Sequence, residues 1–262
     1  MNHAAVENRN NPAQVSALVR HVRSGNVRAV SRLITLLENG HPDGAAGLGL
    51  LSSDGRRTTI IGITGYPGAG KSSLINALVT AYRARGMKVA VLAVDVSSTV
   101  TGGAILGDRI RMQEHALDPC VYIRSMATRG HHGGLAAATQ GAARVMEAAG
   151  YDVVLVETVG VGQNETDVLK IAPTVLAVVA PGLGDEVQAM KAGLLEVAHV
   201  VVVNKGDHPD GESTVRDLRE WCPVVVTTVA TTGKGLPELL EAITAHQQHR
   251  TAAKGSLNRP VT

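Results

Sequence analysis

The sequence predicts an α/β fold, a doubly wound and mostly parallel sheet that follows a short N-terminal helical extension. From Thr58 onward, short runs of β-branched residues alternate with segments of helical apolar spacing, the pattern of parallel strands covered by helices on both faces. The composition agrees: 44% of the 262 residues are apolar, but aromatic residues make up only 2% and Phe is absent. We therefore expect a core of Val, Leu, Ile and Ala.

Residues 1–55 are expected to form the helical extension and a linker. Between residues 13 and 39, apolar residues recur with the spacing i, i+3, i+4, and this pattern is interrupted at Ser24-Gly25-Asn26. It predicts two short helices joined by a turn. Residues 40–57 are rich in Gly, Ser and Asp and are predicted to be a loop. The main domain is placed at residues 56–250, and residues 251–262 are predicted to be a polar tail.

The main domain is predicted to contain seven strands with helices between them. The strands are expected at Thr59 to Thr64, Val89 to Val94, Val121 to Arg124, Val153 to Glu157, Val175 to Ala180, Val200 to Asn204 and Val224 to Thr228. The helices are expected at Lys71 to Arg85, Gly134 to Ala149, Val187 to Ala198, Ser213 to Glu220 and Leu236 to Arg250. Ligands of such folds bind at the carboxyl ends of the strands.

Charge and hydropathy argue against several classes of partner. The net charge is +2 and no cluster of basic residues stands out, so we expect no nucleic-acid partner. No apolar run reaches the roughly 18 residues of a membrane span, and the N-terminus resembles neither a signal nor a transit peptide. We therefore expect no membrane partner and a cytoplasmic protein. Cys120 and Cys222 lie too far apart in the sequence to indicate a cysteine-rich metal site.

A glycine-rich motif follows the first predicted strand. Residues 65–72 match GxxxxGK[ST] and precede a predicted helix, the context in which this motif cradles phosphates on backbone N–H groups. Lys71 would neutralise charge on the phosphates, act in catalysis and face solvent, and Ser72 would bind Mg²⁺. The alternative is a strand-to-helix turn without a ligand. The predicted nucleotide-binding residues here are Gly65, Pro67, Gly68, Ala69, Gly70, Lys71, Ser72 and Ser73.

Three acidic residues are candidates for the magnesium site that a bound nucleotide requires. Asp95 and Glu157 end apolar strands, and Asp108 lies in a glycine-rich loop. In proteins Mg²⁺ is usually held by one or two carboxylates together with phosphate oxygens and waters. We therefore predict that Ser72, Asp95, Asp108 and Glu157 bind the metal, some of them through water.

Residues 157–160 occupy the place of the acid-x-x-Gly switch of G proteins. The N–H of Gly160 is the predicted contact to the γ-phosphate, and Glu157 is a predicted catalytic residue. The next residue, Val161, cannot orient the attacking water because its side chain forms no hydrogen bond. Gln163 is the nearest amide and is the predicted water-positioning residue. Slow intrinsic hydrolysis, accelerated by a partner, is therefore expected.

A second motif favours guanine over adenine. Asn204-Lys205-Gly206-Asp207 matches NKxD after an apolar strand. The Asp207 carboxylate can accept from N1–H and the N2 amine of guanine. Adenine offers neither donor, so binding adenine would leave the carboxylate unpaired and would cost about 1–3 kcal/mol of binding free energy. Lys205 is expected to lie along the base, Asn204 to tie neighbouring loops, and the backbone N–H of Ala230 to donate to guanine O6. GTP and GDP are thus the predicted ligands.

Three longer segments resemble one family. They are LAVDVSSTVTGGAILGDRIRM (92–112), VETVGVGQNETDV (156–168) and GLGDEVQAMKAGLLEVAHVVVVNKGD (182–207). They resemble the G-protein chaperones of cobalamin enzymes, called MeaB in bacteria and methylmalonic aciduria type A protein in humans, also known as ArgK or LAO/AO transport kinases. The resemblance covers residues 15–245.

The resemblance implies a GTPase that gates cofactor loading and protection of an adenosylcobalamin-dependent acyl-CoA mutase. The adenosylcobalamin belongs to that partner mutase, and the chaperone itself uses Mg²⁺. The segment Gly182 to Lys191 resembles an additional switch of the family. It implies that Asp185, Gln188 and Lys191 are candidates for coupling nucleotide state to the mutase; the alternative is an exposed start of a helix.

The sequence departs from the family at its C-terminus. Family members continue into a helical dimerisation arm, whereas this chain ends about a dozen residues after His249. The sequence therefore does not decide whether the protein forms a homodimer. Two other functions remain alternatives: a transport-associated ATPase or kinase, and a GTP-binding regulatory module with little hydrolysis. Tight ATP binding would favour the former, and an absence of mutase-stimulated hydrolysis would favour the latter.

Overall fold

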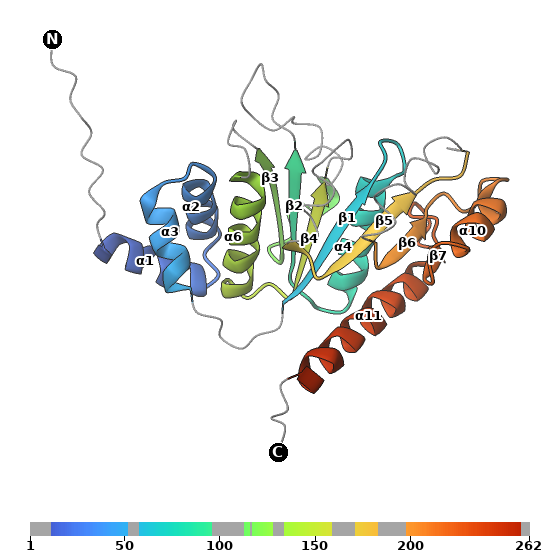
Figure 1. Ribbon diagram of the computed structural model, residues 1–262. Coiled ribbons are helices and arrows are strands. Elements are labelled where there is room, and N and C mark those ends of the chain that lie inside the picture. Colours follow the sequence, from blue (N-terminus) through green and yellow to red (C-terminus); the bar gives the residue numbers. More distant parts are fainter. Residues whose placement is uncertain are drawn as a thin grey trace, which may run out of the picture.

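The computed structural model describes residues 12–51, 58–95, 113–115, 117–127, 134–158, 171–182 and 198–257 (Figure 1). Within these ranges, seven strands form one sheet in the order β3-β2-β4-β1-β5-β6-β7, and every pairing is parallel. The predicted doubly wound sheet is confirmed. The strands are β1 (Thr59–Gly65), β2 (Val89–Asp95), β3 (Val121–Ala127), β4 (Val153–Thr158), β5 (Thr174–Val179), β6 (Val200–Val203) and β7 (Val225–Thr227).

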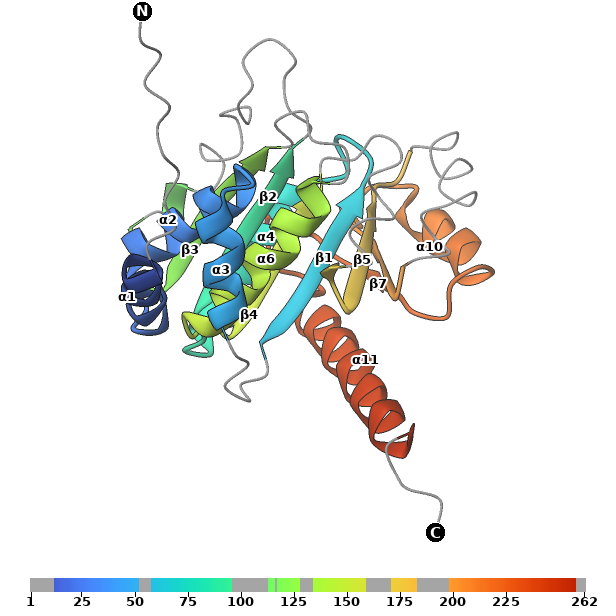
Figure 2. The same cartoon turned by 60° about the vertical axis from the view of Figure 1, so that its left-hand side comes forward.

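Helices cover both faces of the sheet (Figures 1 and 2). One face packs against α4 (Lys71–Ala84) and α11 (Leu236–Leu257), through strand residues such as Ile63 and Leu155. The opposite face packs against α6 (Gly134–Ala148) over β2, β3 and β4, and against α10 (Gly211–Arg219) over β5 and β6. Alternate residues of β4 therefore belong to different cores, which explains why this strand is apolar from Val153 to Val156.

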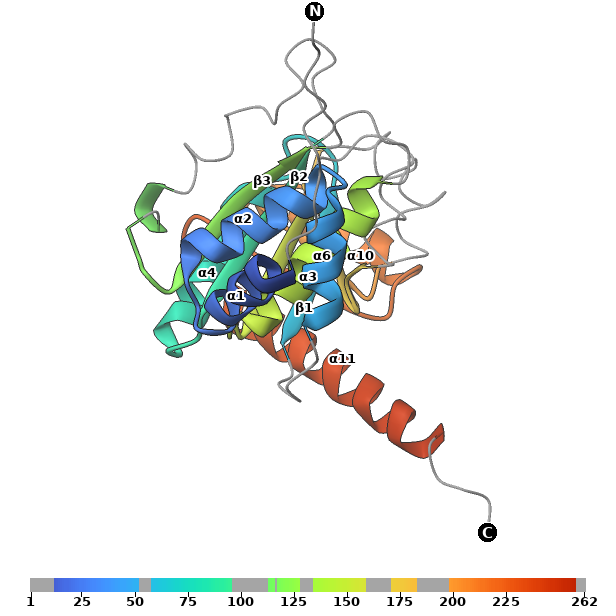
Figure 3. The same ribbon diagram turned by 90° about the vertical axis from the view of Figure 1, so that its left-hand side faces the viewer.

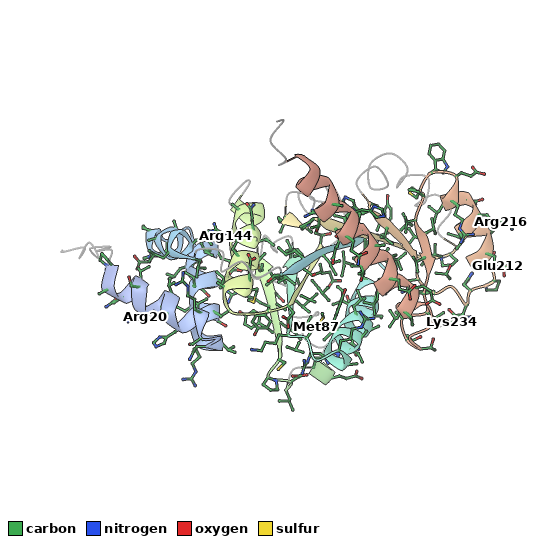
Figure 4. All side chains as sticks on the ribbon, turned by 90° about the horizontal axis from the view of Figure 1, so that it is seen from below. Arg20, Met87, Arg144, Glu212, Arg216 and Lys234 are labelled. Atoms are coloured by element: carbon green, nitrogen blue, oxygen red, sulfur yellow. The ribbon has the colours of Figure 1, made fainter. Side chains whose placement is uncertain are left out.

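The N-terminal extension forms three helices that pack beside α6 and β3 (Figure 3). The two predicted helices are confirmed as α1 (Pro12–Arg23) and α2 (Val27–Glu38), joined by the predicted turn. On β3, Arg124 donates to the backbone oxygen of Ser31 at 3.1 Å and pairs with Glu38. In the view from below, Arg20 and Arg144 lie at this end of the molecule, and Glu212 and Arg216 lie at the other (Figure 4).

The loop predicted for residues 40–57 is wrong in part, because α3 (Pro42–Leu50) occupies it. Pro42 lies in the first turn of this helix, where its missing N–H costs nothing. The glycines that suggested a loop serve packing instead: Gly44 and Gly47 are buried, and a Cβ on Gly47 would come within 2.8 Å of Leu33 Cδ1. The close approach of α2 and α3 therefore selects glycine here.

Helix α11 continues to Leu257, beyond the predicted end at Arg250 and into the segment expected to be a polar tail. In the part of the helix whose burial is described, up to Ala252, the buried residues lie between Leu236 and Ile243. The helix extends past the edge of the sheet in all three ribbon views (Figures 1, 2 and 3). The helix predicted at Val187 to Ala198 lies almost wholly outside the described residues. No helix in the described parts of the chain is long and apolar enough to cross a membrane.

Two histidines join α11 and the start of β6 to the first residues of β5. His199 Nδ1 accepts the N–H of Val175 at 3.0 Å, and His246 Nδ1 lies 3.1 Å from the hydroxyl of Thr174. The two rings are 4.2 Å apart. Because His199 Nδ1 is an acceptor, protonating it would bring two donors face to face. Burial and then Arg250 lower the pKa of His199, while burial, His199, Arg250 and His249 lower the pKa of His246.

From the lowered pKa values of His199 and His246 we predict a loss of stability in mild acid. A histidine whose pKa is lowered in the folded chain binds a proton more readily in the unfolded chain. Its contribution to the free energy of unfolding is therefore present above about pH 6.5 and is lost as the pH falls below that value. We expect the midpoint of urea unfolding to decline between pH 7 and pH 5.5, and to decline less in His246→Gln. His21→Gln, at an exposed position, is the control. Equal pH dependence in wild type and His246→Gln would contradict the assignment.

Candidate nucleotide-binding site

The phosphate-binding motif forms the turn between β1 and α4. Gly65 has φ 141° and Gly70 has φ 90°, backbone conformations that favour glycine. A side chain would also overlap its surroundings at both positions, because Cβ would meet the carbonyl oxygen of Val178 at Gly65 and the amide of Asn204 at Gly70. Helix α4 begins directly after Gly70, so its N-terminal N–H groups and positive dipole end are directed at the turn.

The sequence predicted that Lys71 faces solvent, and this prediction is wrong. Its side chain is buried, and Nζ donates to the carbonyl oxygens of Gly65 at 2.6 Å and Tyr66 at 3.0 Å. Carbonyl dipoles of the turn therefore hold the ammonium group over the loop. A sequence pattern could not show this, because it depends on how the turn folds back over the first residue of α4.

The second residue of α4 contacts the end of β4. Ser72 Oγ donates to Glu157 Oε1 at 3.0 Å, and the Glu157 side chain is only 4% exposed. Two of the predicted metal ligands, separated by 85 positions, are thus brought into direct contact. Hydroxyl and carboxylate oxygens are the donors that Mg²⁺ prefers, so the residues present fit this ion. Among the described residues, no cluster of three or more His, Cys, Asp or Glu forms a metal site without other ligands.

Other predicted residues are placed less completely. Asp95 is the last residue of β2, next to the end of β4, since the preceding Val94 pairs with Thr158. This register brings its backbone to the same edge of the sheet as Glu157. Asp108, Gly160, Gln163, Asp185, Gln188 and Lys191 lie outside the described residues.

Asn204 links the phosphate loop to the loop after β7, as expected from the sequence. It is 2% exposed. Its Nδ2 donates to the carbonyl oxygen of Ala69 at 3.0 Å, and its Oδ1 accepts from Thr228 Oγ1 at 3.2 Å and from the N–H of Ala230 at 3.1 Å. One buried amide, 135 positions after Ala69 and 26 positions before Ala230, therefore holds the two loops together.

The predicted base-binding residues lie beyond the ends of β6 and β7. The backbone N–H of Ala230, the predicted donor to guanine O6, donates to Asn204 Oδ1 at 3.1 Å in this structure. Lys205 and Asp207 are exposed at the end of β6, and Lys205 has φ 58°, which is unusual for a residue other than glycine. Lys205 and Ala230 line a cleft that the phosphate-binding turn also borders, whereas Asp207 is not among the residues that line it.

A cleft of about 1150 Å³ joins these groups. It runs along the exposed face of α4 and is bounded by the phosphate loop, Glu157, and the loop between β7 and α11. Sequence reasoning missed Asn76, Thr80, Thr231 and Thr232. Asn76 and Thr80 follow Ser73 at helical spacing, a signal that could have identified them. The lining residues are Pro67, Gly68, Gly70, Lys71, Ser72, Ser73, Asn76, Ala77, Thr80, Ala81, Ala84, Glu114, Glu157, Lys205, Ala230, Thr231, Thr232, Gly233 and Leu236.

Comparisons with known proteins agree on one family. The profile described as "Methylmalonyl Co-A mutase-associated GTPase MeaB" matches residues 30–260. A putative GTPase of Pyrococcus horikoshii is 47% identical over 247 residues, which cover 89% of this chain and 78% of the relative. The GTPase ArgK of Escherichia coli is 38% identical over 261 residues, which cover 93% and 79%. A solved structure titled LAO/AO transport system kinase superposes with a TM-score of 0.72 and 31% identity, covering 93% of this chain and 78% of that chain.

Proposed function

This chain belongs to the MeaB family of methylmalonyl-CoA mutase-associated GTPases, and we propose that it couples GTP hydrolysis to cofactor loading and protection of an adenosylcobalamin-dependent acyl-CoA mutase. The observation that carries the proposal is that one cleft is lined by Lys71, Ser72 and Glu157 and also by Lys205 and Ala230. Candidate groups for the phosphates, the metal and the base thus border one space.

At the phosphate end, Lys71 supplies a fixed positive charge. The carbonyl oxygens of Gly65 and Tyr66 hold its ammonium group, so little reorganisation is needed when charge develops on the transferred phosphate. Together with the N-terminus of α4, this arrangement supports binding of a triphosphate rather than a neutral ligand.

Ser72 and Glu157 would hold Mg²⁺, with Asp95 and Asp108 as further candidate ligands. The 3.0 Å contact between the Ser72 hydroxyl and the Glu157 carboxylate supports this assignment. When bound, Mg²⁺ would neutralise negative charge on the phosphate oxygens. Glu157 is buried, so its carboxylate is held at the end of β4. Gly160 is the proposed contact to the γ-phosphate, and Gln163 is the proposed residue that positions the attacking water.

At the base end, Asp207 is the proposed reader of guanine, with Lys205 along the base. The backbone N–H of Ala230, which donates to Asn204 Oδ1 in this structure, is the proposed donor to guanine O6. Asp207 is exposed, and contact with guanine would satisfy its carboxylate with two donors. A titration of the protein with GDP, GTP and ATP tests the assignment. Tight ATP binding without a preference for guanine nucleotides would refute it.

Asp207→Asn is expected to shift base preference from guanine toward xanthine. The amide can donate to the O2 of xanthine, where the carboxylate accepted from the N2 amine of guanine. We expect GDP affinity to fall about tenfold or more, as for the loss of a hydrogen bond to a charged group, and XDP affinity to rise. Asp217→Asn, on the exposed side of α10, should change neither. Retained guanine preference in Asp207→Asn would move base recognition to other residues.

The partner is proposed to be a methylmalonyl-CoA mutase or a related adenosylcobalamin-dependent acyl-CoA mutase, in agreement with the name of the family. Asp185, Gln188 and Lys191 are the proposed residues that couple nucleotide state to this partner. The adenosylcobalamin would belong to the mutase, and the GTPase would work by changing its own conformation between nucleotide states.

A further inference from the structure

The proposed base-reading loop between β6 and α10 is packed against the end of β7. The N–H of Gly206 donates to the carbonyl oxygen of Thr228 at 3.0 Å, and the N–H of Thr228 donates to that of Val203 at 2.8 Å. These bonds continue the pairing of β6 with β7 beyond the last strand residues. The backbone immediately before Asp207 is therefore fixed to β7.

Gly206 has close neighbours on two sides, and one of them leaves no room for a side chain at this residue. On one side, a Cβ at this position would overlap the Cγ2 methyl of Thr227. On the other, the first residue of α10 lies close behind: a Cβ on Gly211 would come within 2.9 Å of the carbonyl oxygen of Gly206. Gly206 is thus enclosed between β7 and the start of α10.

The residue before Gly206 indicates the same constraint. Lys205 has φ 58°, in the left-handed region that only glycine and a few polar residues adopt readily. A residue is kept in such a conformation when its surroundings determine the path of the chain. Here the surroundings are the hydrogen bonds and close contacts of Gly206, which directs the chain onward to Asp207.

From this packing we infer that Gly206 is a positioning residue for guanine recognition. It occupies the position that the motif NKxD leaves unspecified, and in this chain its lack of a side chain seats the loop against Thr227. A side chain at residue 206 would displace the backbone that carries Asp207 unless Thr227 gave way. The inference rests on the proposed function, because it assumes that Asp207 reads the N2 amine of guanine.

The test compares the affinities of GDP and IDP. The hypoxanthine base of IDP lacks the N2 amine. The dissociation constant of IDP divided by that of GDP therefore reports the contact with Asp207 and cancels effects at the phosphates. We expect Gly206→Ala to reduce this ratio about tenfold, which corresponds to the loss of one hydrogen bond to a charged group. Adding Thr227→Ser, which removes the overlapping methyl from an exposed side chain, should restore the ratio.

Three controls separate the possible failures. Gly49→Ala changes an exposed glycine of α3 with open space around its Cα, and Thr227→Ser alone removes only a methyl; neither should change the ratio. Asp207→Asn should reduce it, and if it does not, the proposed reading of guanine fails. If Asp207→Asn reduces the ratio while Gly206→Ala leaves it unchanged, or if Thr227→Ser does not rescue Gly206→Ala, the positioning role of Gly206 is wrong. Urea unfolding of each variant verifies that it is folded.

Discussion

Lys71→Ala is expected to lower the rate of GTP hydrolysis by about 10²–10³-fold, the usual loss when one preorganised group that stabilises developing charge is removed. GTP affinity should fall as well, because the only charged side chain of the phosphate loop is lost. The measurement is single-turnover hydrolysis at saturating nucleotide, accompanied by titration with GTP.

The same substitution should also destabilise the free protein. Lys71 is buried and donates to two carbonyl oxygens, so we expect a loss of about 1–2 kcal/mol in the free energy of unfolding. Lys88→Ala, at an exposed position before β2, is the matched control and should affect neither property. Unchanged hydrolysis in Lys71→Ala would refute the role given to this residue.

Asn204→Ala is expected to weaken both the fold and nucleotide binding. The substitution leaves Thr228 Oγ1 and the N–H of Ala230 without their acceptor, and the carbonyl oxygen of Ala69 without its donor. Each unsatisfied buried group costs about 1–3 kcal/mol, less where water can enter. We therefore expect the free energy of unfolding to fall by about 2–4 kcal/mol and GDP affinity to fall by at least tenfold.

Asn204→Asp separates the two sides of this link. It retains the acceptor for Thr228 and Ala230 but replaces the donor to Ala69 with a second oxygen, so it should loosen the phosphate loop while keeping the loop after β7. Urea unfolding and GDP titration of both variants provide the measurements. Equal stability of wild type and Asn204→Ala would contradict the view that this amide holds the two loops together.

The sheet could be predicted from the sequence because strands such as β4, β5 and β6 are buried on both faces and therefore read as apolar runs rich in Val. The missed helix α3 shows the limit of that reasoning. Gly44 and Gly47 resemble loop residues in composition, yet they are selected by contact with α2, and such a contact is visible only when both helices are placed.

The site shows a similar division. Motif spacing was sufficient to nominate Ser72 within the phosphate-binding motif, and Glu157 and Asn204 at the ends of β4 and β6, because parallel strands end at one edge of the sheet. Spacing could not show that Lys71 is held by carbonyl groups, or that the N–H of Ala230 is engaged by Asn204. Both depend on the conformation of turns, which is determined by the neighbouring loops as well as by the local sequence.

The most direct test of the proposed coupling is GTP turnover measured with and without an adenosylcobalamin-dependent acyl-CoA mutase, with methylmalonyl-CoA mutase as the first choice. We predict slow hydrolysis by the isolated protein and a clear increase when the mutase is added at saturating concentration. Lys71→Ala should show no such increase. Hydrolysis that is equally fast with and without the mutase, in an assay where the two proteins are present at concentrations that allow binding, would contradict the proposed function.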